Sequence, residues 1–407
     1  MARLVAISLM TVALFANSSF AAGLTDSLKT GNPELKSASQ LAFGPEGILF
    51  VGDARQAAVF AIATGDTKAA PAGTIAIKGL NEKIAAMLGI PMDQLAINDV
   101  KVNPISHKVY LAVSRGRGTD GVPLIMTVDS SGKIAEFSLT NTKYAMTTLP
   151  DVPEVKPDGP ARYPEGQSNA NTRLRSISDI SYINGKVLVS GMSNEDFASD
   201  LRSIPFPFAG PAEKSTGIRI WHGQHGRYET QAPIDKFIPY TIDNKEYILA
   251  SYACTPIVKI PLDALKPGAK VMGTTIAEIG SHNTPLEFFG YKKDGRNFLL
   301  MAGSTRGVMK FSADGIGKFD GITPPSQACE QSNDKNRVQN CGVEQAGVPY
   351  ETIQSLKGVW QMVQLDERNA LVLAHREGAA TKLVDGHATW TAYDPTRVLD
   401  LTTIALP

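Results

Sequence analysis

The sequence lacks several signatures of common enzyme chemistry. It contains no Cys-x-x-Cys pair, which excludes a thioredoxin-like redox centre and covalently attached haem. It contains no Gly-x-Ser-x-Gly elbow, the turn that presents the nucleophile of α/β-hydrolases. The glycine-rich run at 116–121 is not followed by a helical pattern, so it does not predict a phosphate-binding loop.

An excess of charge of either sign is also missing. The 407 residues include 40 Lys and Arg and 40 Asp and Glu; without Arg3 in the N-terminal segment, 39 basic residues face 40 acidic ones. Such a balance gives no electrostatic footprint for nucleic acid or for an anionic membrane. No run after the first 21 residues is apolar and long enough to span a bilayer, so membrane insertion is not expected.

The N-terminal segment has the pattern of a secretory signal. Arg3 is the sole charge in the first 25 residues, 4–15 are apolar, and in 19–21 the small residues Ser19 and Ala21 stand at the positions that a signal peptidase reads. A transmembrane anchor is the alternative, but the apolar run is too short for one. We therefore predict that 1–21 is a cleaved signal peptide and that 22–407 form a single domain, in the periplasm or secreted.

Only three cysteines are present, and their placement fits an oxidising compartment. Cys329 and Cys341 flank a strongly polar loop, so we predict a disulfide between them. Such a bridge restricts the loop in the unfolded chain and is worth roughly 2–3 kcal/mol. Two free thiols are the alternative. Cys254 is then unpaired and is expected to be a small buried hydrophobe.

The most informative pattern is an internal repeat. Residues 236–260 align with 287–311 without a gap, and five of the aligned positions are identical. The unit is typical of strand–turn–strand–turn–strand. In an all-β chain of this length, a repeated unit of this kind predicts a propeller, in which neighbouring blades bury one another's apolar faces.

Weaker copies of the unit complete the architecture. They occupy 40–62, 99–115, 179–191 and 360–376. The six units predict an all-β fold, a six-bladed β-propeller with loop insertions and one short helix at 81–89. The apolar run at 398–404 is expected to close the ring against the first blade.

Propeller topology also predicts where a site forms. One mouth of the channel collects the starts of the innermost strands and the ends of the second strands, where acids and arginines recur in this sequence. Arginine is suited to capture carboxylate or phosphate, and carboxylates are suited to Ca²⁺. We predict ligand-binding roles for Arg55, Arg115, His282, Arg306, Trp360 and Arg376. We predict a Ca²⁺ site at Asp99, Asp179 and Glu287. The alternative is that arginines and acids pair and neutralise each other.

The repeat style, as in LAFGPEGILFVGD and DVKVNPISHKVYLAV, resembles the six-bladed gluconolactonase-like extracytoplasmic propellers over most of the chain. This resemblance implies a calcium ion in the channel that activates water or polarises a lactone carbonyl. Asp99, Asp179 and Glu287 are of the residue types that would hold it. The chain is also similar in blade number to quinoprotein sugar dehydrogenases, which bind an acidic quinone with arginines and calcium.

Three functions follow as hypotheses. The first is an exported propeller that binds a small anionic or hydroxylated ligand, with Ca²⁺-assisted hydrolysis of a lactone or ester as its reaction. The second is a non-catalytic binding or scaffold protein that contacts a partner protein through 151–172 and through 192–215, which holds Phe206 and Phe208. The third is a quinone-dependent dehydrogenase. An open acidic mouth favours an enzyme, whereas a mouth plugged by 192–215 favours a scaffold.

Overall fold

The computed structural model describes 23–407 apart from nine gaps, and the sequence predictions at these gaps lie outside it. The gaps are 118–120, 156–171, 224–225, 254–255, 281–282, 323–345, 377–379, 385–386 and 392–395. The signal peptide, the three cysteines, His282 and most of 151–172 therefore lie outside the described residues. No helix in the described part of the chain is long and apolar enough to cross a membrane.

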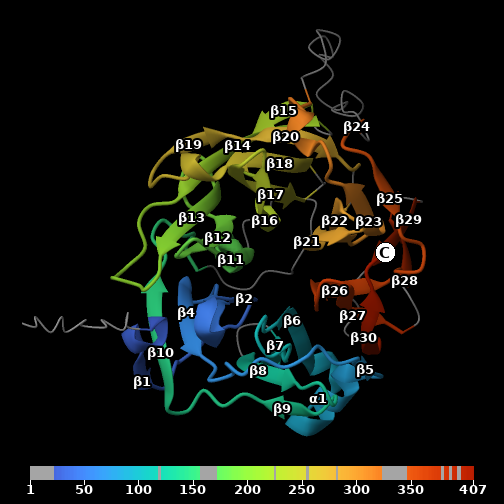
Figure 1. The fold of residues 1–407 in the computed structure, drawn as a ribbon. Helices are drawn as coiled ribbons and strands as arrows, with labels where there is room; N and C mark the ends of the chain where they lie inside the picture. The colour runs from blue at the N-terminus through green and yellow to red at the C-terminus, as the bar shows by residue number, and fades with distance from the viewer. Residues whose placement is uncertain are drawn as a thin grey trace, which may run out of the picture.

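Six sheets, antiparallel in all but one pair of the described strands, stand around a central axis, so the predicted six-bladed β-propeller is confirmed (Figure 1). Blade 1 contains β2 (Gln40–Phe43), β3 (Ile48–Asp53), β4 (Ala58–Ala63), β10 (Thr142–Thr148) and β1 (Lys29–Gly31). Blade 2 contains β6 (Leu95–Val102), β7 (Val109–Arg115), β8 (Val122–Val128) and β9 (Ile134–Glu136). Blade 3 contains β11 (Asp179–Ile183), β12 (Lys186–Met192), β13 (Ser199–Pro205), β14 (Thr216–His222), β15 (Arg227–Glu229) and β19 (Lys270–Met272).

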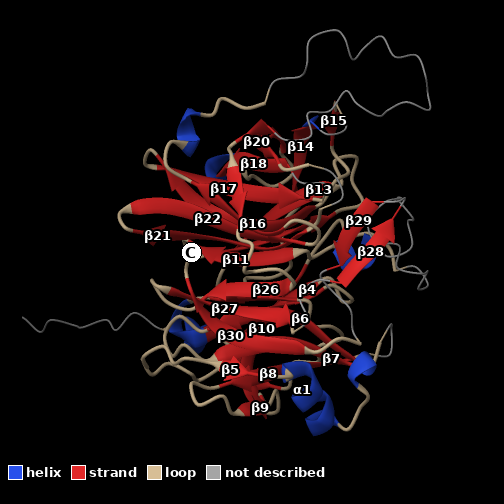
Figure 2. Cartoon of the chain, turned by 90° about the vertical axis from the view of Figure 1, so that its right-hand side faces the viewer, coloured by secondary structure: helices blue, strands red, loops and turns tan. Residues whose placement is uncertain are grey.

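The remaining three blades follow the same inner-to-outer plan. Blade 4 contains β16 (Ile234–Ile242), β17 (Lys245–Tyr252), β18 (Pro256–Pro261), β20 (Thr274–Glu278) and β24 (Ala346–Gly347). Blade 5 contains β21 (Pro285–Lys293), β22 (Arg296–Gly303), β23 (Gly307–Ser312) and β25 (Tyr350–Thr352). Blade 6 contains β26 (Val359–Gln364), β27 (Asn369–His375), β30 (Leu399–Ala405) and β5 (Ala76–Ile77). The hairpin of β28 (Ala380–Val384) and β29 (His387–Thr391) stands apart from the blades (Figure 2).

The apolar cores lie between the blades rather than at the axis. Each interface between neighbouring blades holds one cluster of buried side chains. Successive residues of β3 alternate between two of these clusters, because side chains along a strand point to opposite faces. Phe50 packs toward blade 3, and its neighbours Leu49 and Val51 pack toward blade 2. A blade that is apolar on both faces is thus stable only between two others.

The blades do not follow chain order around the ring. The inner strands contact one another in the order β2, β6, β26, β21, β16, β11 and back to β2, so blade 1 stands between blades 2 and 3 (Figure 1). After β4 the chain leaves blade 1 and adds β5 to blade 6, then builds blade 2 beside it. It returns as β10 to the outer part of blade 1, where β10 pairs with β4 on one side and with β1 on the other.

Ring closure differs from the expectation. The C-terminal run forms β30, which is the third strand of blade 6 and pairs with β27 and with β5. The prediction that it closes against the first blade was wrong, because blade 2 takes that neighbouring place. Asn81 fixes the start of the C-terminal strand in place. Its Nδ2 donates to Arg397 O at 2.9 Å, and its Oδ1 accepts from Leu399 N at 2.8 Å.

Asn81 lies on the single α-helix among the described residues, α1 (Leu80–Leu88), close to the predicted bounds. Gly79 and Gly89 flank it with φ values of 64° and 65°, a left-handed conformation that favours glycine at helix ends. Leu80 and Ile84, four residues apart, bury one face of the helix in the cluster between blades 2 and 6. The helix therefore packs against the interface between blades 2 and 6.

The segment 192–215 is not a loop laid over the surface. Ser199–Pro205 forms β13, which pairs with β12 along its whole length. Phe206 is 5% exposed, and its ring centroid lies 5.0 Å from that of Phe50. Phe206 is buried in the core between blades 1 and 3 and Phe208 packs partly buried against it, whereas partner binding through 192–215 stays a prediction.

Candidate functional site

The channel is narrowed by polar side chains, one from near the start of each inner strand. In four of these strands a β-bulge comes immediately before the polar residue, and bulges commonly re-aim side chains next to functional sites. We call these residues the polar ring. In their order around the axis, they are Gln40, Asp99, Gln361, Glu287, Lys236 and Asp179.

Two lysines neutralise most of the negative charge of the polar ring. Lys101, two residues beyond Asp99 on β6, places Nζ 3.2 Å from Asp99 Oδ1 and 2.8 Å from Glu287 Oε2. Lys236 Nζ lies 3.5 Å from Asp179 Oδ1 and 2.6 Å from Gln40 Oε1. The three carboxylates thus come close enough to share the two ammonium groups.

The carboxylates also tie neighbouring blades together. Asp99 Oδ2 accepts the Leu41 N–H at 2.7 Å, and Asp179 Oδ2 accepts the Phe237 N–H at 2.9 Å. Each bond runs from one inner strand to the next blade around the ring. Backbone donors and ammonium groups therefore satisfy these buried acids.

Titration of this network follows from its charges. Burial acts to lower the pKa of Lys101, but the nearby carboxylates of Asp99, Glu287 and Asp179 outweigh it and raise that pKa. The pKa of Lys236 is raised for the same reason. Burial raises the pKa of Glu287, although both lysines act to lower it. Both lysines therefore stay charged at neutral pH.

This arrangement does not fit the predicted Ca²⁺ site. Ca²⁺ requires several oxygen ligands that converge on one point, and here ammonium groups stand beside the carboxylates instead. No group of three or more His, Cys, Asp or Glu side chains among the described residues is arranged to hold a metal ion. The acids of the polar ring are better suited to holding the channel together than to ligating a cation.

Above the polar ring, on the side where the inner strands start, lies a cavity of about 480 Å³. We call it the mouth cavity, and all six blades contribute to its wall. Its described lining includes four cationic side chains but one acid, Asp235. The cations are Arg55, Arg117, Arg175 and Lys236. The other polar groups include the amides of Gln40, Asn98 and Gln361.

Backbone carbonyls orient two of the arginines. Arg55 Nη1 donates to Gly121 O at 3.2 Å, and Arg117 Nε donates to Asp93 O at 2.8 Å. Arg175 is held differently, since its Nη2 lies 3.3 Å from Asp235 Oδ1. All three guanidinium groups therefore reach the cavity from loops that the blades fix in place.

Asp235 is the extra residue of the β-bulge in β16, and its side chain is 9% exposed. Burial raises its pKa, although Arg175 acts to lower it. Its Oδ2 accepts no hydrogen bond from the described residues, and neither does the Oε1 of Gln361. Both oxygens are buried within the protein, and buried acceptors without donors are uncommon.

The sequence predicted part of this arrangement. Arg55 and Trp360 line the mouth cavity, and Asp99, Asp179 and Glu287 meet beneath it. Their ligand and metal roles stay predictions. The residues that the sequence reasoning missed are Lys101, Arg117, Arg175, Asp235 and Lys236. The sequence held one signal that could have identified Lys236. In the repeat alignment Lys236 and Glu287 occupy the same position of the unit, and they carry charges of opposite sign.

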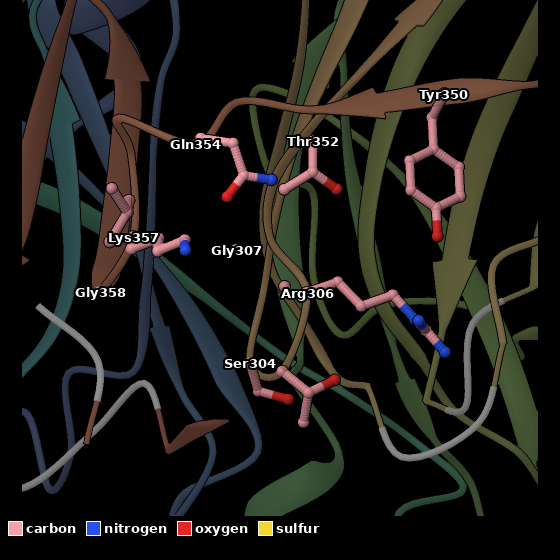
Figure 3. Close-up of a pocket in the computed structure, with 11 residues that line it drawn as sticks. Ser304, Arg306, Gly307, Tyr350, Thr352, Gln354, Lys357 and Gly358 are labelled. Carbon is pink, nitrogen blue, oxygen red and sulfur yellow. The ribbon is translucent and has the colours of Figure 1, made fainter. Parts of the chain in front are cut away.

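The other predicted ligand residues lie elsewhere. Arg115 is exposed at the end of β7, and Arg376 Nη2 pairs with Asp400 Oδ1 at 2.9 Å. Neither lines the mouth cavity. Arg306 lines a second pocket, of about 310 Å³, between blades 5 and 6. There Arg306 points to the side of Tyr350, whereas Lys357 points toward the turn at Gly307 (Figure 3).

Comparison with known proteins adds little beyond the architecture. No family model matches the chain, and no curated protein matches it. Among solved structures, the chain is similar to a PQQ-bound aldose sugar dehydrogenase from Streptomyces coelicolor, with 12% identity, a TM-score of 0.32, and coverage of 93% of this chain and 97% of that one. It is also similar to a putative glucose dehydrogenase from Thermus thermophilus, with 12% identity, a TM-score of 0.29, and coverage of 92% and 99%.

A third similar structure is a luciferin-regenerating enzyme, with 8% identity, a TM-score of 0.29, and coverage of 92% of this chain and 95% of that one. Likenesses this weak carry no argument about function. The six-bladed fold rests on the strand pairing of this chain itself.

Proposed function

We propose that this propeller binds a small organic anion in the mouth cavity. The observation that carries the proposal is the set of four cationic side chains around a cavity of about 480 Å³ whose described lining contains one acid. Clefts lined by one sign of charge concentrate ligands of the opposite sign. The volume is within the range usual for small-molecule sites.

The geometry of the lining supports an anion with a planar head group. Arginine presents paired N–H donors that match both oxygens of a carboxylate or phosphate. Arg55, Arg117 and Arg175 come from three different blades or their connecting loops, so an anion can be held from several directions. Lys236 stands at the floor, where its ammonium group is paired with Asp179 and the polar ring narrows the channel.

Lactone or ester hydrolysis and quinone-dependent oxidation stay predictions from the sequence, as does export. Hydrolysis was expected to use calcium at Asp99, Asp179 and Glu287, and the lysine pairing does not suit a cation there. Partner binding through 151–172 also stays a prediction. The described lining of the mouth cavity includes no residue of 192–215, so that segment does not plug the opening. Ligand binding is the function that the lining of the mouth cavity supports best.

Calorimetric titration of the mature chain tests the proposal. Gluconate and hexanoate are each compared with their neutral amides, and at least one acid is expected to bind about tenfold or more tightly than its amide. Arg175→Gln is expected to weaken acid binding by about tenfold, since a charged hydrogen bond is lost. Arg115→Gln is the matched control, because Arg115 is exposed and lies outside the cavity lining. Absence of binding by both acids, or equal binding of acids and amides, would overturn the proposal.

A further inference from the structure

The arginines of the mouth cavity lie across from an uncharged part of its wall. Arg55 and Arg117 follow the second strands of blades 1 and 2, and Arg175 lies in the connection that enters blade 3. Blades 3, 1 and 2 stand next to one another in the ring, and blades 5 and 6 stand in its other half. Blades 5 and 6 contribute Leu286 and Trp360 but no charged side chain to the described lining.

Trp360 gives this uncharged part of the wall a fixed aromatic surface. It packs against the apolar clusters on both faces of blade 6 and is partly buried. Its Nε1 donates to Ile97 O of blade 2 at 3.3 Å, which holds the indole in one orientation. Because Trp360 also lines the cavity, its accessible part is ready to contact a ligand without rearrangement.

Leu174 brings an apolar side chain to the cationic half of the cavity. It directly precedes Arg175, lines the cavity and is 41% exposed. Sites for small organic molecules are lined mainly by apolar and aromatic side chains, with a few polar groups that fix the orientation of the ligand. An exposed leucine beside a guanidinium fits a ligand in which apolar carbons follow directly on the charged group.

From this arrangement we infer that the anion bound in the mouth cavity is amphipathic, a carboxylate on an apolar body, as in a medium-chain alkyl acid. The arginines take the carboxylate, and the apolar body lies against Trp360 and Leu174. A body covered with hydroxyl groups would gain little there, because removing apolar surface from water favours binding only where both surfaces are apolar. The inference rests on the proposed function and adds the class of ligand, which the cations alone do not determine.

Three acids test the class of ligand by calorimetry on the mature chain. Hexanoate is expected to bind about tenfold more tightly than butanoate, since each buried CH₂ group raises affinity by about fourfold. It is also expected to bind at least about tenfold more tightly than gluconate, which has the same chain length but carries hydroxyl groups. Equal affinities of butanoate and hexanoate, or binding of gluconate as tight as that of hexanoate, would overturn this inference and leave anion binding intact.

The amides separate this inference from the proposed function. If hexanoate and hexanamide bind equally, the cations do not hold the ligand, and the proposed function is wrong whatever the effect of chain length. The same holds if neither hexanoate nor gluconate binds. A preference for acids over amides without any preference for an apolar body contradicts the present inference alone.

Two variants locate the apolar contact. Leu174→Asn keeps the size of an exposed side chain and is expected to weaken hexanoate by about fivefold while leaving gluconate unchanged. Met87→Gln on α1, also exposed and outside the cavity lining, is the matched control and should change neither acid. Trp360→Phe tests the contact by fluorescence, because hexanoate that shields the indole from water is expected to shift the emission of the wild type to shorter wavelength. If Leu174→Asn binds hexanoate as the wild type does, or if the emission shift persists in Trp360→Phe, the apolar body does not lie where we infer.

Discussion

Lys101 on β6 and Glu287 on β21 join blades 2 and 5 across the channel, with Nζ 2.8 Å from Oε2 although 186 residues separate them in the chain. Blade 6 stands between these two blades, so the bond spans the opening instead of linking neighbours. Lys101 also contacts Asp99 of its own strand at 3.2 Å. One ammonium group therefore balances two largely buried carboxylates from two blades that are not neighbours.

Replacing Lys101 by Met is expected to destabilise the fold by about 3–5 kcal/mol, because two buried carboxylates lose their shared cation. Urea unfolding followed by tryptophan fluorescence measures the loss. Lys214→Met is the control, since the Lys214–Glu195 pair is 64% and 49% exposed and exposed ion pairs contribute little to stability. Adding Glu287→Gln to Lys101→Met should recover part of the stability. Equal effects of the two lysine variants would contradict this account.

Replacing Asn81 by Ala tests how the ring is closed. The Asn81 side chain donates to Arg397 O and accepts from Leu399 N, so it pairs the helix with the strand that completes blade 6. Its removal leaves two buried backbone groups without partners, and we expect a loss of about 2–4 kcal/mol. The exposed Asn194→Ala is the control. A thermal midpoint unchanged in Asn81→Ala would mean that β5 pairing alone closes the ring.

The number of blades could be predicted from the sequence because its signals are local. Alternating apolar residues and turn residues recur in every unit, and the aligned copies at 236–260 and 287–311 set the register of the others. Blade order could not be predicted, because it depends on which sheet edges pair. The decisive partner, β5, has two residues, Ala76 and Ile77, too few for any periodic signal.

The residues of the site also fall into two groups, those that the repeat pattern predicts and those that it does not. Strand starts and second-strand ends follow from the units, and that was enough to bring Asp99, Asp179 and Glu287 to one level of the channel. Arg175 and Asp235 lie in a connection and in a bulge, where no repeat signal reaches. Arg115 and Arg376 were expected at the mouth, but Arg115 is exposed outside the cavity lining and Arg376 is paired with Asp400.

A buried acid in blade 3 predicts how stability changes with pH. Asp200 Oδ2 lies 2.6 Å from Arg202 Nη2, and both side chains are fully buried. Burial raises the pKa of Asp200 to about 6, although Arg202 acts to lower it. The ordinary pKa in an unfolded chain is about 3.9, so the folded state holds this proton more tightly. The resulting stabilisation is complete below about pH 4 and is lost as the pH rises through about 6.

Asp200→Asn removes this titration and therefore isolates it. From pH 4 to pH 7, wild-type stability should fall relative to the variant by on the order of 2–3 kcal/mol. Denaturant unfolding at several pH values measures the stability of the wild type and of the variant. Other buried acids with a raised pKa, such as Glu287 and Asp235, contribute equally to both proteins, so the difference between the two curves reports on Asp200. Parallel curves would show that Asp200 titrates at its ordinary pKa.

Gly191 in β12 links the fold to the mouth cavity. A Cβ at this position would clash with Ser176 O and would lie 2.8 Å from Arg175 O, both of them backbone atoms. Gly191→Ala must therefore displace the segment that carries Arg175, at a cost of about 3 kcal/mol, and should weaken binding of an organic anion by about tenfold. Gly290→Ala on the inner strand of blade 5 is the control, since its Cβ would stay 3.4 Å from the Tyr240 ring. Calorimetry and urea unfolding on the same samples separate the two effects: lost stability with unchanged anion affinity would show that Arg175 does not hold the ligand.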